Sequence, residues 1–120
     1  MAKILVVDDD PAILRFLSQA LENASYSVTS CKNGKEAYEM LQSNQDFDLL
    51  LTDIVMPEMD GIELSKRTKD LCPDLKIMFI TGFLASEAVN KQAIDTSQVL
   101  QKPIHLQDLV RQVDDLLANG

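Results

Sequence analysis

LLLTDIVMPEMDG, residues 49–61, opens with three leucines and places Asp53 just after them, ahead of an acidic turn that contains glycine. The leucines predict a strand that enters the core, where a bare carboxylate is costly to bury. An aspartate at the end of such a strand is therefore unexplained by packing. The rest of the chain indicates a chemical reason for it.

The composition is that of one globular domain. At 120 residues, with 46% apolar and 25% charged residues, the chain is long enough for a core and too short for two domains. The net charge of −8 argues against nucleic acid or an anionic membrane as a direct partner. Cys31 and Cys72 have no CxxC spacing and are interpreted as reduced packing residues. The short apolar run at residues 4–7 is neither a signal peptide nor a spanning helix, so we expect a cytoplasmic protein.

Short apolar runs alternate with helical patterns along the chain. Strands are predicted at 4–7, 27–31, 49–51, 77–80 and 98–101. The strongest of these runs are continuously apolar, which is typical of strands covered on both faces. Strand and helix alternate five times, and this order predicts an α/β fold with a parallel sheet and helices on both sides.

Polar residues that can cap a helix precede three of the helical patterns. Asp10 before Pro11, Asn33 with Glu36, and Asp60 with Glu63 are the predicted helix starts. The first helix should bury a stripe made of Ile13, Phe16, Leu17, Ala20, Leu21 and Ala24. The last should bury Leu106, Leu109, Val110, Val113, Leu116 and Leu117. Segment 82–97 is weaker and predicts at most a short helix at about 86–92.

Polar side chains follow the ends of several predicted strands. Asp8 and Asp9 follow the first strand, Asp53 the third, Thr81 the fourth and Lys102 the fifth. The carboxyl ends of parallel strands meet in one crevice, so these groups should converge. Three carboxylates held together repel one another, and a hard divalent cation relieves that repulsion. Oxygen ligands without histidine predict Mg²⁺. By contrast, Asp10 and Asp60 are interpreted as caps, and His105 as a surface residue.

Four segments in this order resemble the receiver domain of two-component response regulators: ILVVDDDP (4–11), LLLTDIVMPEMDGIEL (49–64), IMFITG (77–82) and QKPIHLQDL (101–109). The resemblance covers essentially the whole chain and implies a single receiver domain, residues 1–120. It also implies a flavodoxin-like (βα)5 fold, doubly wound, with a parallel five-stranded sheet in the order 2-1-3-4-5.

The same resemblance implies a role for each residue of the site. Asp53 is the expected phosphoacceptor. Mg²⁺ is expected on Asp9, Asp53 and the main-chain carbonyl of Val55, with Asp8 holding it through water. Thr81 should bond one phosphoryl oxygen and Lys102 should pair with another. Apart from taking up and losing this phosphoryl group, the protein is not expected to be an enzyme.

Three positions depart from the family pattern. Val99 stands where relatives usually carry an aromatic residue, and its stiff β-branched side chain cannot swing inward as that aromatic does. Phe83, two residues after Thr81, is the alternative switch residue. Val55 and Phe83 are apolar where polar residues are common, so we expect water to attack the phosphoryl group slowly.

The main hypothesis is a signalling switch in a bacterial phosphorelay. Its partners would be a histidine kinase or histidine phosphotransferase and an output protein. The chain also resembles single-domain regulators of the CpdR type, cell-cycle adaptors of the ClpXP protease. One alternative is a receiver cut from a hybrid histidine kinase. A phosphatase of the haloacid-dehalogenase kind needs a second acid where Val55 stands, and a flavin site needs a phosphate loop that DDDPAI (8–13) does not provide.

Overall fold

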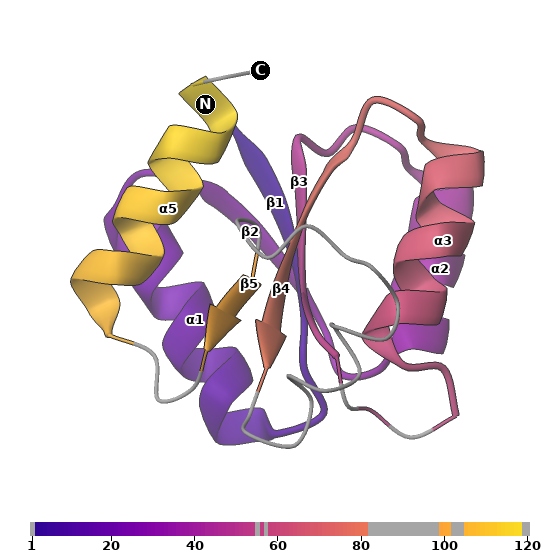
Figure 1. Ribbon diagram of the computed structural model, residues 1–120, viewed down its shortest axis with the longest axis horizontal. Coiled ribbons are helices and arrows are strands. Elements are labelled where there is room, and N and C mark those ends of the chain that lie inside the picture. Colours follow the sequence, from indigo (N-terminus) through magenta and orange to yellow (C-terminus); the bar gives the residue numbers. More distant parts are fainter. Residues whose placement is uncertain (1, 55, 57, 82–98, 102–104, 119–120) are drawn as a thin grey trace.

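The computed structural model describes residues 2–54, 56, 58–81, 99–101 and 105–118, and this part forms a five-stranded sheet between two helical layers (Figure 1). The strands are β1 (Lys3–Val7), β2 (Ser27–Cys31), β3 (Leu49–Asp53), β4 (Lys76–Thr81) and β5 (Val99–Gln101). The helices are α1 (Pro11–Asn23), α2 (Gly34–Ser43), α3 (Gly61–Leu71) and α5 (Leu106–Ala118). α1 and α5 cover one face of the sheet, and α2 and α3 cover the other.

The sheet order in the described part is β2-β1-β3-β4-β5, and every pairing is parallel. β1 and β3 therefore lie inside the sheet, and all five residues of β3 are buried. The parallel sheet covered on both faces confirms the fold class predicted from the continuous apolar runs. It also puts the carboxyl ends of all these strands at one edge.

Two apolar clusters hold the layers together, one on each face of the sheet. Side chains alternate between the faces along a strand, so Leu50 joins the cluster under α2 and α3. Its neighbours Leu49 and Leu51 join the cluster under α1 and α5. All three leucines have no exposed surface. The leucine run that opens β3 therefore contributes to the core on both faces of the sheet.

The three predicted capping residues begin their helices. Each side chain accepts hydrogen bonds from backbone N–H groups in the first turn, which have no partner within the helix. The donors are Ala12 (2.9 Å) and Ile13 (3.4 Å) for Asp10, Glu36 (2.7 Å) for Asn33, and Glu63 (2.8 Å) for Asp60. The interpretation of Asp10 and Asp60 as caps is therefore confirmed.

The predicted apolar stripe of α1 was too wide. Leu17, Ala20 and Leu21 are buried, whereas Phe16 is 41% exposed. A helix turns 100° per residue, so position 16 lies at the flank of the stripe centred on Leu17 and Leu21, and the sheet does not reach it. β3 and β4 also extend beyond their predicted ends, to Asp53 and Thr81. The short helix expected at 86–92 lies outside the described residues.

None of the described helices has both the length and the apolar character required to cross a membrane. His105, directly before α5, is exposed, as the sequence predicted. Its carbonyl accepts a hydrogen bond from the Leu109 backbone N–H at 3.0 Å. Its observed role is thus in the first turn of α5.

Candidate functional site

The strand register places Asp8 beside Asp53. Val7, the last residue of β1, is level with Thr52 on β3. One residue further along each strand come Asp8 and Asp53. On its other side Asp53 is level with Ile80 of β4. Both carboxylates are therefore delivered to the same edge of the sheet by central strands.

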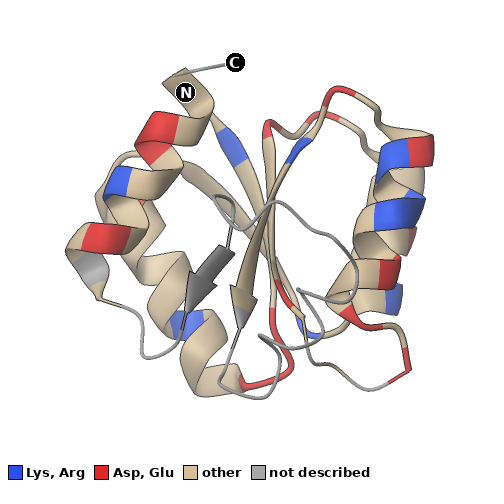
Figure 2. Cartoon of the chain, viewed as in Figure 1, with Lys and Arg blue, Asp and Glu red and all other residues tan. Residues whose placement is uncertain are grey.

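Asp8, Asp9 and Asp53 each offer a carboxylate oxygen, and these oxygens all lie within 4.8 Å of one another. Asp8 has no exposed surface, Asp53 is 4% exposed, and Asp9 is exposed. The loop from β1 into α1 that carries the first two is visibly acidic (Figure 2). Two of the three carboxylates are therefore buried, and the third is open to solvent.

Backbone groups fix the position of Asp8. One of its carboxylate oxygens accepts a hydrogen bond from the Asp10 N–H at 2.8 Å. Its own N–H donates to the carbonyl of Cys31, at the end of β2, at 3.3 Å. Because Asp10 also caps α1, the cap and the carboxylate cluster are parts of one rigid turn.

Tight packing also fixes the chain that leaves Asp53. The Ile54 N–H donates to the Ile80 carbonyl at 3.0 Å, and the Gly61 N–H donates to the Ile54 carbonyl at 2.8 Å. A Cβ at Gly61 would lie only 2.1 Å from the Asp53 carbonyl oxygen, so a side chain there does not fit. Glu58, within this loop, has a φ of 67°, the left-handed conformation that side chains rarely adopt. The hydrogen bonds and the close contact thus hold Ile54 and Gly61 against the ends of β3 and β4.

The donor set fits Mg²⁺. Hard divalent cations prefer oxygen ligands, and Mg²⁺ is usually bound by a few carboxylates together with several waters. Three carboxylates converge here, and one of them is open to water. Close carboxylates also repel one another, and a bound cation offsets that repulsion. The observed cluster thus supports the site that the sequence predicted for Asp8, Asp9 and Asp53.

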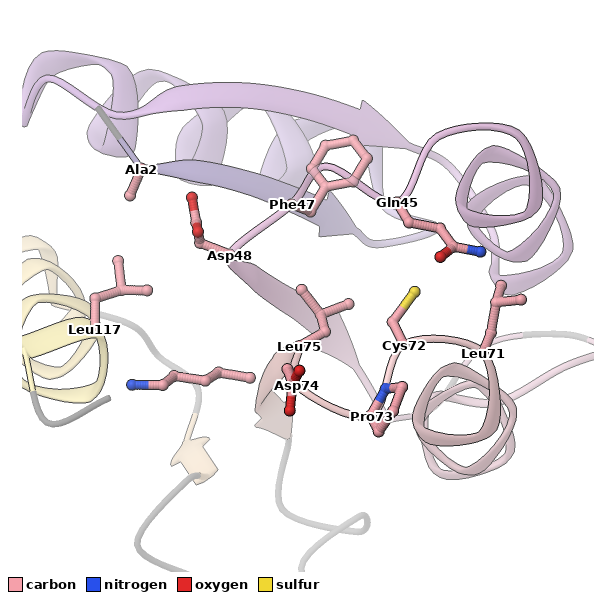
Figure 3. A pocket seen from close by; sticks show the side chains of 11 residues that line it. Ala2, Gln45, Phe47, Asp48, Leu71, Cys72, Pro73, Asp74, Leu75 and Leu117 are labelled. Carbon is pink, nitrogen blue, oxygen red and sulfur yellow. The ribbon is translucent and has the colours of Figure 1, made fainter.

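A cavity of about 720 Å³ lies at the opposite end of the sheet (Figure 3). Ala2, Asp48 and Leu75, which directly precede β1, β3 and β4, line it together with Cys72. Asp53 is at the other end of β3, so the cavity is separate from the carboxylate cluster. It plays no part in the chemistry considered for Asp53.

The cysteines are not candidate nucleophiles. Cys31 is a buried free thiol, and burial together with the nearby Glu36 carboxylate raises its pKa to about 12. Burial also raises the pKa of the free thiol of Cys72. Both thiols are therefore protonated near pH 7, and the thiolate is the reactive form of cysteine.

The family model described as the response regulator receiver domain matches residues 4–114. This chain belongs to that family. The response regulator receiver protein CpdR of Brucella abortus is 55% identical over 119 residues, which cover 98% of both chains. Other relatives are longer: this receiver domain spans 51% of some regulators and 12% of a sensor kinase.

Solved structures of receiver proteins have the same fold. A receiver protein from Sinorhizobium medicae has a TM-score of 0.88 and 30% identity, covering 98% of this chain and 94% of that one. The response regulator TrrA of Thermotoga maritima, solved in complex with Mg²⁺-BeF, has a TM-score of 0.84 and 30% identity. The coverage is 97% of this chain and 99% of that one. The flavodoxin-like receiver fold and its parallel sheet are thus confirmed.

Several predicted site residues are not described. Val55, Phe83 and Lys102 lie outside the described residues, and only the backbones of Thr81 and Val99 are placed. Thr81 ends β4, one residue beyond the partner of Asp53, and is level with Gln101 on β5. The roles of these five residues in the receiver domain remain predictions.

The sequence did not reveal the backbone groups that hold the site. The hydrogen bond to the Cys31 carbonyl joins two different strands, and the close approach of Gly61 to Asp53 depends on the fold of the loop between them. The pair Asp60–Gly61 signalled a turn and a cap, but only the assembled sheet shows what the glycine contacts. The sequence did contain one indication of the role of Gly61. Glycine is a poor helix former, so a glycine at the first position of a helix indicates a packing constraint there.

Proposed function

We propose that this receiver domain is a Mg²⁺-dependent switch in which Asp53 accepts a phosphoryl group. The observation that carries the proposal is the convergence of Asp8, Asp9 and Asp53 within 4.8 Å at the carboxyl edge of the sheet. Asp53 ends a completely buried strand, so its carboxylate is held in one place. A fixed carboxylate next to a cation site suits attack on an anionic phosphoryl donor.

In the proposed reaction a carboxylate oxygen of Asp53 forms a bond to phosphorus. The bond from phosphorus to the donor breaks, and the donor leaves with that electron pair. Asp9, Asp53 and the Val55 carbonyl would hold Mg²⁺ directly, and Asp8 would hold it through water; the ion would supply positive charge next to the phosphoryl oxygens. Lys102 pairs with another of these oxygens.

The aspartyl phosphate carries about two negative charges and attracts hydrogen-bond donors from its surroundings. Thr81 is proposed to donate its hydroxyl hydrogen to a phosphoryl oxygen. Thr81 ends β4, one residue beyond Ile80, which is paired with Asp53, and this position supports the role. We propose that the Phe83 side chain moves when Thr81 moves, because Val99 is too short to replace the aromatic side chain that moves in relatives.

The proposed donors are a histidine kinase or a histidine phosphotransferase, and the proposed output is a change in binding to another protein. The likeness to CpdR over nearly the whole of both chains supports an output made by this domain itself. The resemblance of the sequence to regulators of the CpdR type suggests the ClpXP protease as that partner. A pull-down with the phosphorylated and unphosphorylated forms distinguishes which state binds.

Incubation of the purified protein with acetyl phosphate and Mg²⁺ is expected to add one phosphoryl group, measured as intact mass. Omission of Mg²⁺ in the presence of EDTA should lower the uptake at least about tenfold, because the charge of the incoming phosphoryl group is then not neutralised. In parallel, p-nitrophenyl phosphate should not be turned over. Continuous release of nitrophenol, lost in an Asp53→Asn variant, would instead identify a phosphatase.

A further inference from the structure

The turn between β2 and α2 contacts both segments that bring the carboxylates together. At its start, the Cys31 carbonyl accepts the hydrogen bond from the Asp8 N–H. At its end, Gly34 begins α2 and packs against Met59, in the loop that follows Asp53. This one turn therefore contacts both the acidic segment after β1 and the loop after β3.

The contact at Gly34 leaves no room for a side chain. A Cβ at this position would lie 2.7 Å from the Met59 carbonyl oxygen, and 3.2 Å and 3.3 Å from the Met59 Cβ and Cγ. The nearest obstacle is main chain, which cannot rotate away as a side chain does. Alanine is the better helix former at a helical position, so helix propensity does not favour glycine here. Close packing against Met59 accounts for the glycine.

A displacement of Met59 has few ways to be absorbed. Met59 is partly buried against the cluster under α2 and α3. The next residue, Asp60, caps α3, and the Gly61 N–H donates a hydrogen bond to the Ile54 carbonyl at 2.8 Å. Gly61 also lies directly against the Asp53 carbonyl. A backbone shift at Met59 is therefore transmitted to the end of β3.

We propose that Gly34 is a positioning residue for the carboxylate site. By letting the loop after Asp53 lie against the first turn of α2, it holds that loop in place beside the carboxylates that the β1–β3 register brings together. This inference rests on the proposed function, since the affinity for Mg²⁺ measures how well the three carboxylates are placed. Gly34 itself contacts neither the ion nor the phosphoryl group.

The test compares Gly34→Ala with a matched control, Gln42→Ala, which changes an exposed, uncharged residue of the same helix. Mg²⁺ affinity is measured by titration calorimetry on the phosphate-free proteins, and thermal melts without metal are recorded beside it. Gly34→Ala should bind Mg²⁺ about tenfold more weakly, as substitutions that displace metal ligands indirectly do. Gln42→Ala should bind within twofold of the wild type.

A folded Gly34→Ala protein with wild-type Mg²⁺ affinity overturns the inference, even if its melting temperature falls, because the glycine would then be merely structural. If the variant does not fold, NMR of the wild-type protein decides. Coupling is reciprocal, so added Mg²⁺ must shift the amide resonances of Gly34 and Met59. Unchanged resonances overturn the proposal. A wild-type protein that binds no Mg²⁺ refutes the proposed function itself.

Discussion

Asp53→Asn is expected to abolish uptake of phosphoryl groups from acetyl phosphate, lowering the incorporation by roughly two orders of magnitude or more because an amide is a poor nucleophile. The amide has nearly the shape of the carboxylate, so the end of β3 and the hydrogen bond from the Thr52 hydroxyl to the Asp53 carbonyl, 2.9 Å, should persist. Intact-mass spectrometry of the protein after incubation with acetyl phosphate and Mg²⁺ measures the incorporation.

Asp60→Asn is the matched control for this substitution. It removes the same charge from the loop after β3, and asparagine is as good a helix cap as aspartate. Because the Asp60 carboxylate is used as the cap of α3, this variant should take up phosphoryl groups like the wild type. Equal incorporation in Asp53→Asn and the wild type would mean that another carboxylate is the acceptor.

Asp9→Asn is expected to have opposite effects with and without metal. In the absence of metal, removing one of three carboxylates within 4.8 Å lessens their repulsion. The free energy of unfolding should rise by on the order of 1 kcal/mol, the size of a like-charge interaction at this distance near water. With Mg²⁺, the variant should bind at least about tenfold more weakly, since a charged ligand is lost. Urea denaturation with EDTA and with Mg²⁺ measures both effects.

Asp10→Asn is the control for the neighbouring charge. It keeps a good cap on α1 and removes a carboxylate that is not in the cluster. Its stability without metal and its Mg²⁺ affinity should stay close to those of the wild type. An Asp9→Asn protein that is less stable than the wild type in EDTA would contradict the view that the three carboxylates are crowded.

Local patterns predicted the parts of this receiver domain that depend on neighbours in sequence. Asn33 and Asp60 were recognised as caps because a cap and its partner lie within one turn of helix. The leucines of β3 predicted a strand buried on both faces. The meeting of Asp8 with Asp53 followed from the parallel sheet, whose strand ends share one edge.

Features set by distant segments were not predictable in this way. The contact of Gly34 with Met59 depends on how α2 lies against the loop after β3. The exposure of Phe16 depends on how much of α1 the sheet covers, which periodicity does not report. Adjacent acids look alike in sequence, yet Asp8 is fully buried, with its carboxylate accepting a hydrogen bond from the Asp10 N–H, whereas Asp9 is exposed.

The most direct test of Asp53 as the phosphoacceptor locates the phosphoryl group on the wild-type protein. Borohydride reduces an aspartyl phosphate to homoserine, and digestion followed by peptide mass spectrometry identifies the converted residue. After incubation with acetyl phosphate and Mg²⁺, we predict homoserine at position 53 and unchanged aspartate at positions 8 and 9. Homoserine at Asp8 or Asp9, or none at Asp53 in a protein that carries a labile phosphoryl group, would contradict Asp53 as the acceptor.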